Sequence, residues 1–171
     1  MLSFDIRSLI DHAVTVDDEL PLDDPVWHAD DLKPSAPLHV RGRLSGAGPG
    51  RFYWHGTING DVALECSRCL GPASAHVEEE AHLIFAEAGG EDISDDPDVY
   101  VLEAREDELD LRPAIREQWM LNVPGYALCR DDCKGLCATC GAELNLGDCD
   151  CSSDAAASRW AGLRKLQEEQ A

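Results

Sequence analysis

The segment LHVRGRLSGAGPGRFYWHGTINGDVALE, residues 38–65, decides the fold class of this chain. Residues 38–44 alternate apolar and polar side chains, and residues 45–50 contain three glycines and a proline. Residues 51–58 are rich in aromatic and β-branched side chains. Two β-type patterns joined by a glycine-rich connection predict a β-hairpin.

Further strands are predicted beyond the hairpin. Asn59-Gly60 tolerates positive φ at both central positions of a turn, so it predicts a turn before a third strand at residues 61–65. Residues 73–86 form a long alternating pattern that predicts a fourth strand with an inward face of Val77, Ala81, Leu83 and Phe85. Residues 99–102 predict another short strand after a charged loop.

Helices are predicted only toward the carboxyl terminus. Leu111, Ile115 and Trp119 are spaced by four residues before Pro124, which indicates one amphipathic helix. A last helix is predicted from apolar side chains that share a face: Ala156, Trp160, Leu163 and Leu166. The predicted fold class is α+β, with an antiparallel β-meander sheet, one packed helix, a C-terminal Cys-rich zinc-binding element and a terminal helix.

The chain divides into three predicted parts. Residues 1–37 lack periodicity and contain four prolines, so they are expected to form an N-terminal arm. Residues 38–124 are expected to form a β-rich core with its helix. Residues 125–171 are expected to form the zinc element with the C-terminal helix, because few large apolar side chains precede Cys151 and an ion would have to order this segment.

The charge of the chain disfavours unaided binding to nucleic acids. Its 171 residues include 14 basic and 34 acidic side chains, for a net charge of −20. Affinity for phosphates depends on clustered Lys and Arg, so a basic protein partner suits this chain better than DNA. Arg41, Arg43, Arg51 and Arg68 offer the only predicted spot for local RNA contact.

The amino-terminal segment predicts a cytoplasmic protein without membrane contact. Asp5 and Asp11 stand where a signal peptide would be apolar, and no run of about 18 apolar residues occurs. Disulfides are therefore less expected than metal binding for the eight cysteines.

The cysteine spacing predicts zinc. Zn²⁺ takes four thiolates in a tetrahedron, and the Cys-x-x-Cys turn at residues 137–140 presents two sulfurs to one ion, with Gly141 free to adopt the required backbone angles. Spacing alone leaves open which cysteines complete the site, and whether one or two ions bind. The candidate ligands are Cys66, Cys69, Cys129, Cys133, Cys137, Cys140, Cys149 and Cys151.

A catalytic metal site is not expected. His76-Val77-Glu78 matches the first half of the zinc deaminase motif, but Leu136 replaces the proline that should precede Cys137. Alternation along the predicted fourth strand places four side chains on one face, where a solvated sheet surface is favoured over a divalent-ion site: His76, Glu78, Glu80 and His82. We therefore predict no catalytic residues and no enzymatic activity.

Two cysteine blocks resemble a known family. The segments LECSRCL (residues 64–70) and LCRDDCKGLCATCGAELN (residues 128–145), followed by Cys149-Asp150-Cys151, are similar to the bacterial YceD family of large ribosomal RNA subunit accumulation proteins. The likeness covers roughly residues 38–167. It implies a non-enzymatic cytoplasmic factor that supports the accumulation or processing of large-subunit (23S) ribosomal RNA.

Charge and resemblance together predict ribosome biogenesis through protein contacts. The partner would be a basic ribosomal protein or a large-subunit assembly factor, held by the acidic residues 78–110. Arg68 and the zinc element could touch ribosomal RNA locally. The alternative is a zinc-organised regulatory protein whose thiols are redox-sensitive, so that oxidation ejects the metal.

Overall fold

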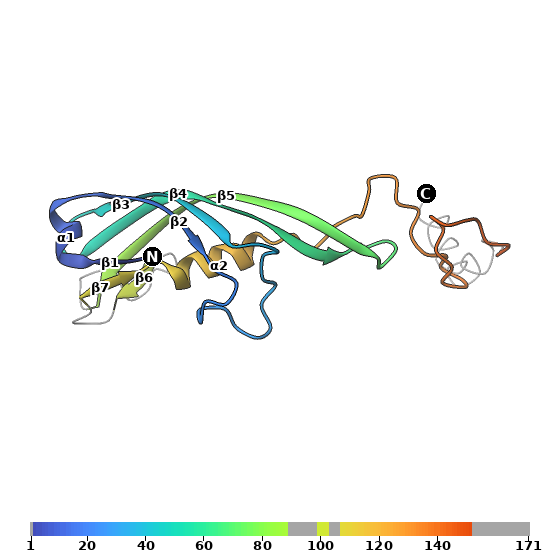
Figure 1. Ribbon diagram of the computed structural model, residues 1–171, viewed down its shortest axis with the longest axis horizontal. Helices are drawn as coiled ribbons and strands as arrows, with labels where there is room; N and C mark the ends of the chain where they lie inside the picture. The colour runs from blue at the N-terminus through green and yellow to red at the C-terminus, as the bar shows by residue number, and fades with distance from the viewer. Residues whose placement is uncertain (1, 89–98, 103–106, 152–171) are drawn as a thin grey trace, which may run out of the picture. The chain divides into compact units, whose positions relative to one another are not determined.

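The protein is a mixed α+β structure, as predicted, with a mostly antiparallel sheet and two short helices among the residues described. The computed structural model describes residues 2–88, 99–102 and 107–151. Five strands form the main sheet, in the order β2 (Val14–Leu20), β3 (Leu38–Gly46), β4 (Arg51–Glu65), β5 (Pro72–Glu87) and β6 (Val99–Leu102). Figure 1 shows this sheet lying over helix α2 (Arg112–Asn122).

The strand order is that of a meander, because each strand is hydrogen-bonded to its neighbour in the sequence. β3 pairs antiparallel with both β2 and β4, and residues 47–50 close the predicted hairpin through an Ala47 N–H bond to the carbonyl of Arg51. β6 is the exception, since it runs parallel to β5 with Ile84 opposite Val99. The expectation of a fully antiparallel sheet is therefore wrong at this edge.

The turn predicted at Asn59-Gly60 is also wrong. Both residues lie inside β4, where Asn59 pairs with His39 of β3. Gly60 serves close packing instead, because a Cβ at this position would lie 3.0 Å from Leu38 and 3.3 Å from the Trp119 ring. Packing against α2 thus overrides the local turn preference.

The predicted amino-terminal arm contains regular structure. β1 (Ser3–Asp5) pairs with β7 (Glu108–Asp110), α1 (Ile6–Asp11) follows, and β2 forms an edge of the main sheet. The Asp5 side chain caps α1 by accepting bonds from the Arg7 and Ser8 N–H groups. The longest part of the predicted arm without helix or strand is residues 21–37.

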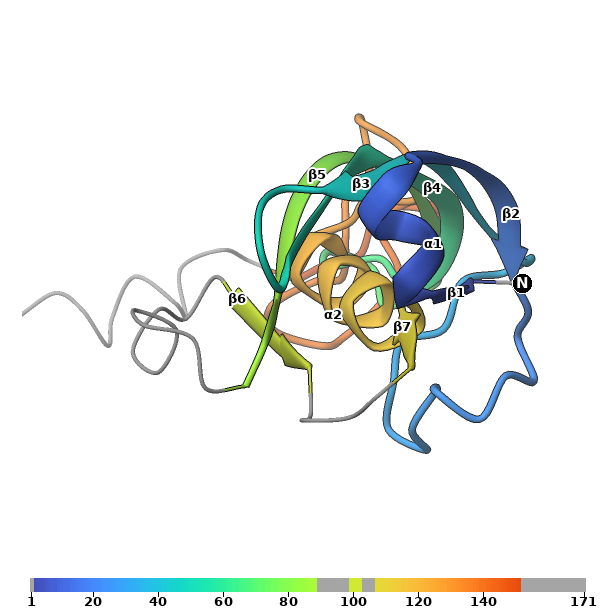
Figure 2. The ribbon, with the colours of Figure 1, turned by 90° about the vertical axis from the view of Figure 1, so that its left-hand side faces the viewer.

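The core lies between the sheet and α2. Phe52, Trp54 and Ile58 alternate along β4 and are buried, while Tyr53 lies on the other face of the strand. Ile115 and Trp119 are buried side chains of the predicted amphipathic helix, and the Trp119 indole N–H donates to the Leu32 carbonyl at 2.7 Å. Figure 2 shows the sheet curving around α2, which excludes water from this apolar layer.

Contacts group the described residues into two compact units. The first unit comprises Met1–Ala63 and Ala75–Gly125, and the second comprises Leu64–Ser74 with the described part of Tyr126–Ala171. The segment Leu64–Ser74, which joins β4 to β5 and includes the adjoining ends of both strands, therefore groups with the Cys-rich tail. The predicted terminal helix and most of the predicted charged loop lie outside the described residues. Neither described helix has the length and apolar character needed to cross a membrane.

Candidate metal centres

The eight cysteines gather into two groups of four within the second unit. The first cluster is Cys66, Cys69, Cys129 and Cys133, and the second cluster is Cys137, Cys140, Cys149 and Cys151. Within each cluster the four sulfur atoms lie within 4.8 Å of one another, and all eight cysteines carry free thiols. All the predicted ligands are therefore brought together, in a pairing that their spacing left open.

Sulfur separations in the first cluster suit a tetrahedral ion. The Cys66 and Cys133 sulfurs are 3.7 Å apart, as are the Cys69 and Cys129 sulfurs. Four sulfurs bound at about 2.3 Å from a tetrahedral zinc ion would be separated by about 3.8 Å. The cluster can therefore close on such an ion with little rearrangement.

The first two ligands lie on a tight turn between β4 and β5. The Cys66 N–H donates to the Gly71 carbonyl at 2.8 Å, and the Leu70 N–H donates to the Cys66 carbonyl at 2.9 Å. Closing this turn requires positive φ at Leu70, which has φ +59°. The turn directs both Cys66 and Cys69 toward the same point.

The second cluster uses the same turn. The Cys137 N–H donates to the Ala142 carbonyl at 2.8 Å, and the Gly141 N–H donates to the Cys137 carbonyl at 2.9 Å. Gly141 has φ +74°, in agreement with the role predicted for it. Two segments 71 residues apart thus form equivalent Cys-x-x-Cys turns, each completed by two further cysteines.

Two polar side chains that the sequence did not single out as supporting groups orient Cys133. The Asn145 amide donates to the Cys133 sulfur at 3.3 Å, and its oxygen accepts from the Lys134 N–H at 2.9 Å. The Arg68 guanidinium donates to the Cys133 carbonyl at 2.9 Å. Such supporting contacts hold a ligand in place before the ion binds. No local pattern identifies Asn145, because its partners lie on a loop that folds back over it.

Thiol ionisation is uneven within each cluster. In the first cluster the Cys69 and Cys129 backbone N–H groups lower the pKa of Cys66 to about 6, while burial and the Cys133 thiol raise the pKa of Cys129 to about 12. In the second, N–H groups of Cys140 and Thr139 lower the pKa of Cys137 to about 6. Four neighbouring thiols resist joint ionisation through mutual repulsion, and a divalent cation removes this barrier.

Four sulfur ligands leave no vacant position on a tetrahedral ion. Such a donor set is typical of structural zinc sites, whereas catalytic sites keep one position for water or substrate. The described part of the second unit contains no histidine that could replace a thiolate. The arrangement therefore suits a metal that stabilises the chain rather than one that activates a substrate.

The other predicted site residues are arranged differently. His76, Glu78, Glu80 and His82 share the exposed face of β5, as predicted, but His76 pairs with Asp61 at 2.8 Å. Arg41 forms an ion pair with Asp17 at 3.3 Å. Arg68 belongs to the second unit, whereas the other three arginines of the predicted basic spot belong to the first. The predicted basic spot is thus divided between the two units.

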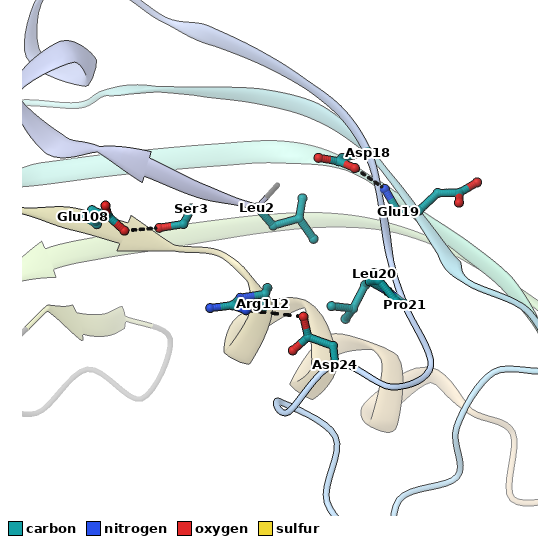
Figure 3. Close-up of a pocket in the computed structure, with 9 residues that line it drawn as sticks. All are labelled: Leu2, Ser3, Asp18, Glu19, Leu20, Pro21, Asp24, Glu108 and Arg112. Carbon is teal, nitrogen blue, oxygen red and sulfur yellow. Dashed lines mark hydrogen bonds and ion pairs between the residues drawn. The ribbon is translucent and has the colours of Figure 1, made fainter.

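A cavity of about 470 Å³ in the first unit contains none of the predicted ligands (Figure 3). Its only basic lining residue is Arg112, which is neutralised by Asp110 at 2.8 Å and by Asp24 at 3.3 Å. Ser3 donates to Glu108 at 2.8 Å across another part of the wall. The residues described in this lining include no histidine or cysteine, so the cavity offers no sulfur or imidazole ligand for a metal.

Comparison with known proteins places the geometry in context. A protein of Zea mays named large ribosomal RNA subunit accumulation protein YCED homolog 1, chloroplastic, is 31% identical over 60% of this chain and 44% of its own length. An uncharacterized protein of Mycobacterium leprae is 32% identical over 52% of this chain and 41% of its own length. The uncharacterized protein YlbN of Bacillus subtilis is 28% identical over 60% of this chain and 57% of its own length.

The match spans about half the length of these relatives. No solved structure matches the chain. A family match covers residues 54–167, which include both Cys-x-x-Cys turns and all eight cysteines of the two clusters. The chain therefore belongs to the family described as large ribosomal RNA subunit accumulation protein YceD.

Proposed function

We propose that this protein is a non-enzymatic ribosome-biogenesis factor that supports the accumulation or processing of large-subunit (23S) ribosomal RNA. The family match over residues 54–167 carries this proposal, because the family is described by that role. The two all-cysteine clusters support a structural rather than a catalytic role for the bound metal. No catalytic step is assigned to the chain.

The resident metal in this proposal is zinc, with one ion in each cluster. Thiolates select Zn²⁺ among common cellular cations, and the 3.7 Å sulfur separations match a tetrahedral site. In the described part of the second unit the buried apolar residues are Cys66, Ala127 and Cys133, none of which has a large apolar side chain. Zinc binding would therefore supply much of the free energy that orders this unit.

The partner in this proposal is a basic ribosomal protein or a large-subunit assembly factor. Residues 61–120 contain 17 acidic and only 4 basic side chains, and Glu78 and Glu80 are exposed on β5. Such a field accelerates encounter with a basic surface and weakens with added salt. Local contact with ribosomal RNA through Arg68 stays a secondary part of the proposal.

Depletion of the protein in its own host tests the proposed role. We expect the ratio of 23S to 16S ribosomal RNA and the large-subunit peak to fall, and wild-type chain supplied in trans to restore both. A chain carrying Cys66→Ser and Cys137→Ser should fail to restore them. An unchanged ratio after complete depletion would refute the proposed role.

A second experiment tests the protein partner separately. Immobilised chain is exposed to proteins extracted from large subunits, and the variant Glu78→Gln/Glu79→Gln is compared with Glu143→Gln/Asp148→Asn, which loses the same two charges. We expect weaker capture by the first variant alone. Equal capture by both variants would count against the acidic sheet surface as the contact.

A redox-sensitive regulator is the second candidate function. It is favoured by the 3.7 Å separation of the Cys66 and Cys133 sulfurs, which leaves the pair close enough to form a disulfide after loss of the metal. Peroxide would take two electrons from the pair. Zinc release and the loss of two thiols per cluster at low peroxide, reversed by a reductant, would support this function, and zinc retention would oppose it.

A further inference from the structure

Three side chains converge on the exposed sheet face of the first unit, apart from both cysteine clusters. His55 lies on β4, and Glu80 and His82 lie on β5, the neighbouring strand of the sheet. Side chains alternate along a strand, so all three point away from the buried core. One potential ligand atom from each residue lies within 4.8 Å of the other two.

The contacts among these residues are close. The His55 Nε2 atom lies 2.8 Å from the Glu80 carboxylate, and the two imidazole rings of His55 and His82 are stacked with centroids 4.4 Å apart. The hydrogen bond from His55 lowers the pKa of Glu80. Two imidazoles and one carboxylate therefore lie together on neighbouring strands, and the two nearly parallel rings, inclined by 12°, do not yet point their nitrogens at one ion.

We propose that His55, Glu80 and His82 form a third metal site, which binds a divalent transition ion such as Zn²⁺. Two imidazoles and one carboxylate are the donors that zinc, copper and nickel prefer, whereas Mg²⁺ and Ca²⁺ prefer oxygen ligands. Nitrogen and oxygen ligands at about 2.1 Å from a tetrahedral ion would lie about 3.4 Å apart. A bound ion lies in the plane of each imidazole, so one of the two stacked rings must turn about its side-chain bonds, which the exposure of all three residues permits.

Tyr53 orients one of the proposed ligands. Its hydroxyl group lies 2.5 Å from the His82 Nδ1 atom. When Nδ1–H donates to the hydroxyl oxygen, Nε2 is unprotonated and available to the metal. Tyr53 is therefore a positioning residue, because it acts through His82.

The proposed site differs in character from the cysteine clusters. It supplies three protein ligands, so water completes the coordination and the ion remains exchangeable. Arg43, which pairs with His55 across β3 and β4, adds positive charge nearby. We therefore expect affinity in the micromolar range, weaker than that of the thiolate clusters.

Zinc titration of the full chain tests this site. The chain is first saturated with zinc, and its cysteines are checked for protection from a thiol reagent. Additional Zn²⁺ is then titrated against an indicator of micromolar affinity. We expect one further equivalent to bind, and His55→Gln and His82→Gln each to weaken that binding at least tenfold, with a smaller loss for Tyr53→Phe.

His76→Gln provides the matched control. His76 lies on the same strand and faces a carboxylate at the same 2.8 Å, but no second histidine joins it in a group of potential ligands among the described residues. Its replacement should leave the further equivalent unchanged. Absence of that equivalent in wild-type chain, or its retention at full affinity in both His55→Gln and His82→Gln, would overturn the proposal.

Discussion

Gly135 is the position at which a single methyl group should weaken the first cluster. It has φ +74°, and a Cβ built there would lie 3.0 Å from the Arg68 carbonyl oxygen and 3.2 Å from the Arg68 Cβ. The Leu136 N–H donates to the same carbonyl at 3.1 Å. Gly135→Ala therefore strains its own backbone and pushes the loop away from the turn that presents Cys66 and Cys69.

The expected loss of zinc affinity follows from two effects, the backbone strain at residue 135 and the close contact with Arg68. A non-glycine residue in the left-handed region costs about 1–2 kcal/mol. If zinc binding and ordering of this unit are coupled, as proposed above, that cost appears as a loss of affinity of about 5- to 30-fold. The contact with Arg68 adds to the strain, so we expect the first cluster to lose at least about tenfold in zinc affinity.

Gly141 and Gly147 provide graded controls. Gly141 has the same φ of +74°, but a Cβ added there would have no atom within 4 Å, so Gly141→Ala should incur the backbone strain alone, at the second cluster. Gly147 has neither positive φ nor a close neighbour, so Gly147→Ala should behave as wild type. The expected order of affinity loss is Gly135→Ala, then Gly141→Ala, then Gly147→Ala.

Alkylation in zinc buffers resolves the two clusters. Reduced chain is equilibrated at a series of free zinc concentrations and treated briefly with an alkylating reagent, and peptides containing Cys133 or Cys149 are quantified by mass spectrometry. Gly135→Ala should shift the protection of Cys133 to higher free zinc. The reasoning is refuted if that midpoint matches wild type, or if Gly147→Ala shifts it equally.

Three other predictions concern positions outside the cysteines. The Arg116 hydrogen bond lowers the pKa of Asp31 to about 2, so the Arg116–Asp31 pair stabilises the fold fully above about pH 4 and progressively less as the pH falls toward 2. Arg116→Gln should therefore lower the free energy of unfolding at pH 7. It should also flatten the pH dependence of that free energy, as measured by urea unfolding. Gly56→Ala would overlap the β3 backbone and should destabilise the first unit by about 3 kcal/mol in the same assay, unlike Gly125→Ala. Asn145→Ala should weaken zinc binding at the first cluster by about 10-fold or more in the alkylation assay, and an unchanged midpoint would contradict its orienting role.

Local patterns predicted much of the fold. The hairpin at residues 45–50, the inward face of β5 and the helix through Ile115 and Trp119 are all confirmed. Each depends on side-chain periodicity or glycine over a few neighbouring residues, which the sequence displays directly. The Cys-x-x-Cys turn that ends at Gly141 was likewise predictable from a few neighbouring residues.

Long-range packing decided the features that local patterns missed. Asn59 and Gly60 favour a turn in isolation, yet β4 passes through them because Gly60 packs against Trp119. β1 and β7 are three-residue strands that stabilise each other across about 105 residues of chain. Such short segments have no periodicity of their own, so only their pairing reveals them.

The amino-acid sequence by itself determined the kind of chemistry available, since eight thiols with turn-forming spacing favour a soft divalent ion over oxygen-bound metals. Tertiary structure alone decided which thiols meet: Cys69 reaches Cys129 across 60 residues, and Cys137 pairs instead with its near neighbours. It also brought His55 beside His82. The type of atom that a residue offers to a metal is a property of that residue alone. Which residues share one ion depends on how distant strands and loops fold together, and the spacing of residues along the chain does not give their separation in space.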